Sequence, residues 1–123
     1  MASPIMYIDA DASISDAARL MQEKKIGSLL VKSNNEYVGI VTETDFTRKV
    51  LGKGLKPETT EVTKVMTAPI LSMEKSELIT EANQFMAKNK VRHLGVTENG
   101  KMVGILSVRD LVHFFANPRL RTW

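Results

Sequence analysis

The chain has 123 residues, of which 43% are hydrophobic and 25% charged, a balance typical of a globular protein that buries a core and one that excludes a disordered chain. The absence of cysteine excludes disulfides, thiolate metal sites and cysteine nucleophiles. The sequence has no apolar run long enough to span a membrane and no signal-peptide pattern, so we expect a cytoplasmic protein without a membrane partner. The net charge of +3 is too small to indicate nucleic acid, and the basic residues between Arg48 and Lys56 are typical of a solvated helix end and connector.

An internal repeat organises the chain, because residues 1–50 match residues 66–115 at a shift of 65 positions without a gap. Two pairs of segments anchor this match: Met1–Ile5 with Met66–Ile70, and Val38–Thr42 with Val103–Ser107. The sequence therefore contains one structural unit twice.

Each copy contains a predicted amphipathic helix in its first half. Ile14, Ala17 and Met21 share one helical face in the first copy, and Ile79, Ala82 and Met86 occupy the same positions in the second. Two β-rich runs follow in each copy, and we expect them to form hairpins: Leu29–Lys32 with Tyr37–Val41, and Leu94–Thr97 with Lys101–Leu106.

Short turns close both hairpins. Asn99-Gly100 is a strong two-residue turn signal because both residues tolerate positive φ, and Asn34-Asn35 is its weaker counterpart. A second helix then begins at Thr42 or Ser107. Each copy is thus predicted to run strand, helix, strand, strand, helix.

The region between the copies has the composition of a flexible surface connection, with glycine, proline and lysine from Leu51 to Thr60. A short helical lead-in is predicted from Thr60 to Met66, with Thr60 as its N-cap. We assign the chain as follows: repeat 1 at 1–52, linker at 53–61, repeat 2 at 62–116 and a C-terminal tail at 117–123. The first copy lacks a lead-in, so either the natural protein continues upstream of Met1 or the tail covers the gap.

The predicted fold class is mixed, α/β (α+β), with two tandem β-α-β-β-α repeats. A unit of about 50 residues cannot easily bury enough apolar surface alone, so the copies should pack about a pseudo-twofold axis. A ligand site is expected in the cleft where equivalent loops meet.

One motif occurs in both copies, at Gly39–Asp45 and at Gly104–Asp110, with the pattern Gly-apolar-apolar-Ser/Thr-x-x-Asp. A carboxylate on the first helical turn can accept two hydrogen bonds from a cis-diol such as that of ribose, while free backbone N–H groups favour a phosphate. The same spacing also fits a helix capping box. Both interpretations remain open on the sequence.

These segments, together with 26–31 and 91–96, resemble the cystathionine-β-synthase (CBS) domain family, whose paired copies form a Bateman module. The resemblance implies a regulatory, non-catalytic module that binds an adenine nucleotide, with AMP as the expected ligand, and it implies no metal. It also implies two sites, each built from both copies. The first would contain Thr42, Asp45, Thr67, Ala68, Pro69, Ile70, Val91, Arg92 and His93. The second would contain Ser107, Arg109, Asp110, Ser3, Pro4, Ile5, Ile26, Gly27 and Ser28.

The two copies differ beside the aspartate. Arg109 adds a permanent cation next to Asp110, so the second site should prefer phosphorylated nucleotides. Thr44 offers only a hydroxyl in the first copy, so charge there must come from Arg92 or His93. His93 is better explained as a partly buried histidine that bonds to backbone groups.

Other functions stay open. The sequence does not indicate an enzyme, because no nucleophile lies at a recognisable spacing from a general base. A ligand-independent dimerisation scaffold is the main alternative, followed by binding of S-adenosylmethionine or nucleic acid. We expect a homodimer, and possible partners include an upstream or separate effector domain. The apolar residues that predict the dimer are Leu111, Val112, Phe114 and Phe115, unless the tail folds back over them.

Overall fold

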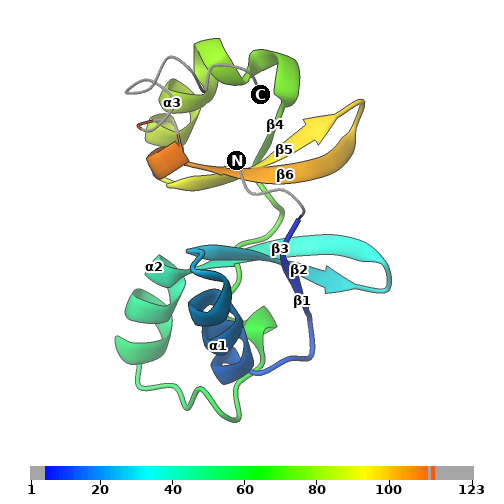
Figure 1. Ribbon diagram of the computed structural model, residues 1–123. Helices are drawn as coiled ribbons and strands as arrows, with labels where there is room; N and C mark the ends of the chain where they lie inside the picture. Colours follow the sequence, from blue (N-terminus) through cyan, green and yellow to red (C-terminus); the bar gives the residue numbers. More distant parts are fainter. Residues whose placement is uncertain (1–4, 111, 113–123) are drawn as a thin grey trace. The chain divides into compact units, whose positions relative to one another are not determined.

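A computed structural model of the chain describes residues 5–110 and 112, and for residues 78–80 it describes the backbone only. The described chain separates into two compact units, each shown in Figure 1. The first unit is Met6–Ile70, and the second contains Ile5 and the described residues from Leu71 onward. The mixed α+β fold predicted from the sequence is confirmed in each unit.

The first unit is a three-stranded sheet in the order β1-β2-β3 with helices on one face (Figure 1). Strand β1 runs parallel to β2, and β2 runs antiparallel to β3. Its elements are β1 (Tyr7–Asp9), α1 (Ile14–Lys24), β2 (Ser28–Ser33), β3 (Glu36–Thr42), α2 (Glu43–Asp45), the π-helix η1 (Phe46–Leu51) and the 3-10 helix η2 (Val62–Lys64).

Helix α1 follows from its local sequence. The Ser13 side chain accepts a hydrogen bond from the Asp16 N–H at 3.0 Å and caps the N-terminus, and Lys25 ends the helix in the left-handed conformation with φ 56°. The predicted stripe of Ile14, Ala17 and Met21 is buried, as expected. It packs on the apolar face of the sheet, and that contact makes the core of the first unit.

The second unit repeats this order, with a sheet β4-β5-β6 paired in the same senses as the first. Its elements are β4 (Ser72–Glu74), the 3-10 helix η3 (Lys75–Glu77), α3 (Leu78–Lys88), β5 (His93–Glu98) and β6 (Lys101–Ser107), and residues 108–110 are helical. Ala82 and Met86 of the predicted stripe are buried against Leu94, Val96 and Leu106. The side chain of Ile79 lies outside the described residues.

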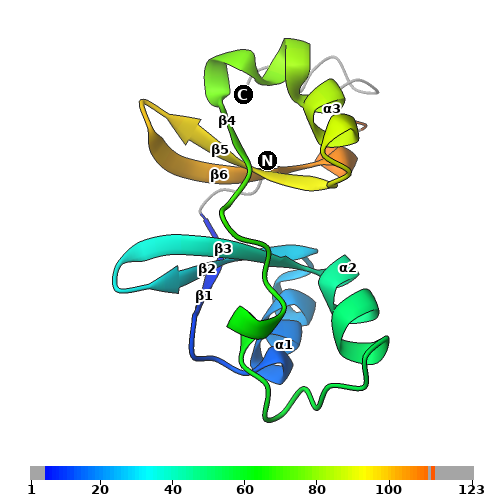
Figure 2. The same cartoon turned by 180° about the vertical axis from the view of Figure 1, so that it is seen from behind.

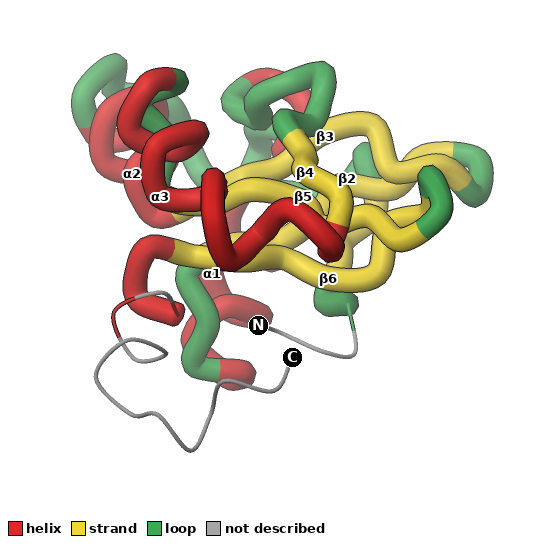
Figure 3. Tube along the Cα trace, turned by 90° about the horizontal axis from the view of Figure 1, so that it is seen from above, coloured by secondary structure: helices red, strands yellow, loops and turns green. Residues whose placement is uncertain are grey.

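Both predicted hairpin turns are confirmed (Figure 3). Asn34 and Asn35 have φ of 50° and 65°, and Asn99 and Gly100 have φ of 54° and 79°. Positive φ at both central residues matches the right-handed twist of the flanking strands. The weaker Asn-Asn signal therefore makes the same turn as Asn-Gly.

The connection between the copies differs from the prediction. It is tied to the start of α1 by backbone hydrogen bonds from Ile14 N–H to Thr60 O at 2.9 Å, Ser15 N–H to Pro57 O at 3.1 Å and Val62 N–H to Ala12 O at 3.0 Å. Glu61, with no side-chain hydrogen bond, occupies the N-cap of η2 that we assigned to Thr60.

Residues 62–70 pack with the first unit, although the repeat pattern places them at the start of the second copy. Val62 and Val65 are buried in the first core, so the segment adds apolar surface that the sheet and α1 lack. Figure 2 shows this segment leaving η2 and passing along β3. We call residues 62–70 the strap.

Candidate ligand-binding site

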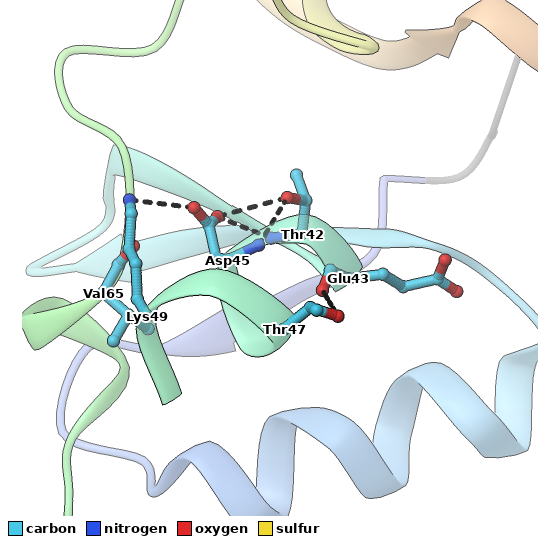
Figure 4. Close-up of polar contacts among 6 residues, drawn as sticks. All are labelled: Thr42, Glu43, Asp45, Thr47, Lys49 and Val65. Carbon is cyan, nitrogen blue, oxygen red and sulfur yellow. Dashed lines mark hydrogen bonds and ion pairs between the residues drawn. The ribbon is translucent and has the colours of Figure 1, made fainter. Parts of the chain in front are cut away.

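The corner between β3 and α2 brings Thr42 and Asp45 together (Figure 4). Asp45 Oδ2 accepts hydrogen bonds from the Thr42 N–H at 2.9 Å and from Thr42 Oγ1 at 3.2 Å, while the Asp45 N–H donates to Thr42 Oγ1 at 3.3 Å. This is the capping box that the spacing allowed. Asp45 is 7% exposed, so the cap also places a carboxylate among buried groups.

A lysine completes this corner. Lys49 Nζ lies 2.8 Å from Asp45 Oδ1 and donates to the Val65 carbonyl, also at 2.8 Å. Lys49 stands four residues after Asp45, where α2 has passed into the wider turns of η1, so its side chain lies over the same helical face. The ammonium thus joins the carboxylate to the strap.

Two further predicted segments meet this corner within the first unit. The Glu43 N–H donates to the Gly27 carbonyl at 3.1 Å, and Ser28 pairs with Thr42 across the β2-β3 ladder. On the other edge of β3, Ile40 and Thr67 exchange two backbone hydrogen bonds of 3.0 and 2.8 Å. The strap therefore runs beside the strand that ends at Thr42.

The strap positions of the predicted site differ in exposure. Thr67, Ala68 and Pro69 are exposed, and Ile70 is half-buried. They precede the first strand of the second unit, which begins at Ser72.

The second copy builds an equivalent corner. Asp110 Oδ2 accepts from the Ser107 N–H at 2.9 Å, and the Asp110 N–H donates to Ser107 Oγ at 3.1 Å. The Val108 N–H donates to the Arg92 carbonyl at 2.9 Å, as Glu43 does to Gly27, and His93 pairs with Ser107. Asp110 is half-buried and Arg109 is exposed.

The structure thus groups the predicted site residues by unit. Thr42, Asp45, 26–28 and 67–70 belong to the first unit, whereas 91–93, 107–110 and Ile5 belong to the second. The assignment of 91–93 to the Asp45 site, and of 5 and 26–28 to the Asp110 site, joins the two units and stays a prediction. Ser3 and Pro4 lie outside the described residues.

One inference about charge was wrong. We reasoned that charge near Asp45 must come from Arg92 or His93, but Lys49 supplies a cation in direct contact with Asp45. Lys49 belongs to the basic run between Arg48 and Lys56 that is predicted to be solvated. The i,i+4 spacing from Asp45 and the change to phenylalanine at the equivalent position 114 are the sequence signals that could have indicated this role.

Two negative findings apply to the described residues. Among residues 5–110 and 112, no group of three or more His, Cys, Asp or Glu side chains could hold a metal ion. Within the same part of the chain, no helix has the length and apolar character needed to span a membrane.

Comparison with known proteins agrees with the repeated corner. The family model described as "CBS domain" matches twice, at residues 1–52 and 62–117. The chain belongs to the CBS domain family. The resemblance to a pair of CBS domains noted in the sequence is thereby confirmed.

Several related proteins are CBS proteins by name. The chain is 35% identical over 112 residues to the CBS domain-containing protein CBSCBSPB2 of Arabidopsis thaliana, covering 90% of this chain and 21% of the relative. This chain therefore spans about a fifth of that curated relative. Identity to the uncharacterized protein MJ0450 of Methanocaldococcus jannaschii is 30%, covering 91% of this chain and 61% of the relative.

Solved structures give the same result. A protein of Burkholderia ambifaria MC40-6, described as a signal-transduction protein with CBS domains, matches with 34% identity and a TM-score of 0.87, covering 97% of this chain and 87% of that one. The hexameric CBS-CP12 protein of bloom-forming cyanobacteria matches with 31% identity and a TM-score of 0.84, covering 96% and 71%. CBS pairs of this kind are regulatory or signal-transduction modules, and these names indicate no enzyme.

Proposed function

We propose that this CBS pair is a regulatory module that senses an adenine nucleotide, with AMP as the first ligand to test. The observation that carries the proposal is the recurrence of one polar corner: a hydroxyl residue that ends a strand and an aspartate three residues later, in both copies. Membership in a family of regulatory modules supports the same reading. The expected cytoplasmic location stays a prediction.

The capping box and the proposed binding role are compatible. A carboxylate has about four acceptor positions on its two oxygens. At the first corner, Oδ2 accepts both bonds from Thr42 and Oδ1 pairs with Lys49, so about one acceptor position remains. A ribose hydroxyl is a donor of the required kind. The cap therefore orients the carboxylate without exhausting it.

Calorimetric titration of AMP tests the proposal. Asp45→Asn and Asp110→Asn each keep an oxygen for the cap but remove the charge that would bind the diol. Hydrogen bonds to a charged group contribute about 1.5–3 kcal/mol, so we expect affinity at the altered site to fall about 10- to 150-fold. AMP that binds the wild type and both variants equally would contradict the proposal.

A ligand panel separates the other candidates. Thermal shift with AMP, ATP and S-adenosylmethionine ranks the adenosine compounds, because a ligand at 100 times its dissociation constant adds about 2.7 kcal/mol of stability. We expect 2′-deoxy-AMP, which lacks the diol, to give a smaller shift than AMP. Nucleic-acid binding would instead appear as affinity that falls steeply with salt.

A second candidate function is assembly, either with or without a ligand. Val112 is 63% exposed, and a large apolar side chain in that position is available to a partner. Leu111, Phe114 and Phe115 lie outside the described residues. The CBS-CP12 relative is hexameric by name. We expect this chain to form a homodimer, and sedimentation that shows a monomer at high micromolar concentration would contradict it.

A further inference from the structure

The two copies carry their cations at different positions around the aspartate. In the second copy Arg109 precedes Asp110, and position 114 is phenylalanine. In the first copy Thr44 precedes Asp45, and Lys49 follows it by four residues. Each copy therefore has a basic residue close to its aspartate in the sequence, and in the first copy Lys49 is bound to the carboxylate itself.

Lys49 limits what Asp45 can bind. Three of the roughly four acceptor positions of the carboxylate are filled, two by Thr42 and one by Lys49. A cis-diol needs two acceptor positions, so one of the three present bonds must yield. The Thr42 bonds hold the start of the helix, whereas Lys49 is 36% exposed on a flexible four-carbon stem. The bond from Lys49 is the one most easily exchanged.

The released ammonium would stay close to the ligand. Lys49 Nζ is also held by the Val65 carbonyl, which keeps it near the corner when Asp45 Oδ1 is occupied by a hydroxyl. An ammonium without its carboxylate needs a new anion, since a partly buried charge is costly when unpaired. An anionic group on the same ligand satisfies that need.

We propose that Lys49 is the specificity-determining residue of the Asp45 site: it competes with the ligand's hydroxyls for Asp45 and then pairs with the ligand's anionic group. The inference rests on the proposed nucleotide binding and goes beyond it by naming the selected chemistry. The Asp45 site selects ligands that carry both vicinal hydroxyls and an anionic group. A nucleoside must displace Lys49 without supplying an anion, so it binds less well than its phosphate ester.

The experiment compares AMP and adenosine by calorimetry. It uses Asp110→Asn as the background, so that the Asp45 site is observed by itself. In this background we compare Lys49, Lys49→Met and Lys49→Arg. Arg48→Met is the matched control, because Arg48 is exposed on the same helix and its loss changes the net charge equally.

We expect Lys49→Met to lower the preference for AMP over adenosine about tenfold, the effect of one charge-assisted contact. AMP should bind more weakly, while adenosine should bind as well as before or better, because its competitor is gone. Lys49→Arg should keep the preference, and Arg48→Met should leave it unchanged. A merely structural role for Lys49 would weaken both ligands together and leave their ratio constant.

The possible failures can be told apart. If the wild-type protein binds none of the adenosine compounds of the panel, both the proposed function and the role of Lys49 are wrong. If the wild type binds AMP but the Asp110→Asn background does not, the Asp45 site is no nucleotide site and only the present inference falls. The role of Lys49 is also wrong, with the proposed function unaffected, if Lys49→Met has the melting temperature of the background and the same ratio of AMP to adenosine affinity. Should Lys49→Met fail to fold, a folded Lys49→Gln variant with unchanged preference also overturns the inference.

Discussion

In the first copy the motif aspartate is 7% exposed and paired with Lys49, whereas in the second copy Asp110 is half-buried beside the exposed Arg109. The reciprocal cap is the same in both, with hydrogen bonds of 2.9 Å from the Thr42 and Ser107 N–H groups. The Ser/Thr and Asp of the motif therefore set the position of the carboxylate, while a variable position inside the motif (Thr44 or Arg109) and Lys49 beyond it set its charged surroundings. The two corners thus differ in their charged neighbours while the Ser/Thr and Asp positions stay the same.

The two cores differ in a parallel way. The first includes Val62 and Val65 of the strap, which the repeat pattern assigns to the other copy. The second core is formed by residues from Met73 to Leu106. Equivalent substitutions in the two cores can therefore test how separately the units are stabilised.

The largest effect is expected from Leu29→Ala and Leu94→Ala, which occupy the same position of the repeat and are both 0% exposed. Each should cost about 2–5 kcal/mol in urea denaturation, because each leaves a cavity in a packed core. Native-state hydrogen exchange should accelerate first in the unit that carries the substitution. Equal acceleration in both units for both variants would show that the two cores open together.

A smaller effect is expected where the strap crosses β3. A Cβ at Gly39 would lie 2.5 Å from Met66 Sδ and 3.0 Å from the Thr67 carbonyl oxygen. Gly39→Ala should therefore cost about 1–3 kcal/mol, because the Met66 side chain and the Thr67 carbonyl must shift to admit the methyl group. Thermal or urea denaturation measures this loss.

Met66→Ala supplies the control for the Gly39 prediction, since it removes the closest atom. In that background Gly39→Ala should cost less, and the difference measures the coupling of the two positions. Strictly additive effects would indicate that the contact with Met66 is not the cause.

Much of this structure could be predicted because its signals are local. The α1 stripe, the positive-φ turns and the Ser/Thr-x-x-Asp spacing each depend on residues within a few positions of one another, and all three have the expected structure. The path of the connection from Leu51 to Thr60 could not be read from composition, because glycine, proline and lysine indicate a solvated chain whether or not its backbone bonds to α1. The i,i+4 spacing could have indicated that Lys49 pairs with Asp45, but the hydrogen bond from Lys49 to the Val65 carbonyl, sixteen residues away, follows from no local pattern.

The smallest expected effect concerns the strand edge of the second copy. The Thr97 hydroxyl and the Asn99 N–H both donate hydrogen bonds to the Glu74 carboxylate. In the first copy the position equivalent to Thr97 is Lys32, whose Nζ lies 4.6 Å from the ring centre of Tyr7 instead. The hydrogen bond from Thr97, followed by that from Asn99, holds the pKa of Glu74 below its ordinary value. The ionised form is therefore favoured in the folded chain.

The lowered pKa of Glu74 predicts how its contribution to stability changes with pH. Because the folded pKa is depressed, the stabilisation is fully present above the ordinary glutamate pKa of about 4.3 and is lost as the pH falls through the folded pKa. The advantage of wild type over Glu74→Gln should thus be constant near neutrality and shrink on acidification. The effect should be small because Glu74 is only half-buried, so solvent screens its charge. Carbon-13 NMR titration of Glu74 measures its pKa directly. Thr97→Val should raise this pKa, because it removes the hydrogen bond that lowers it most. Identical titration of Glu74 in the wild type and in Thr97→Val would show that this hydrogen bond does not form in solution.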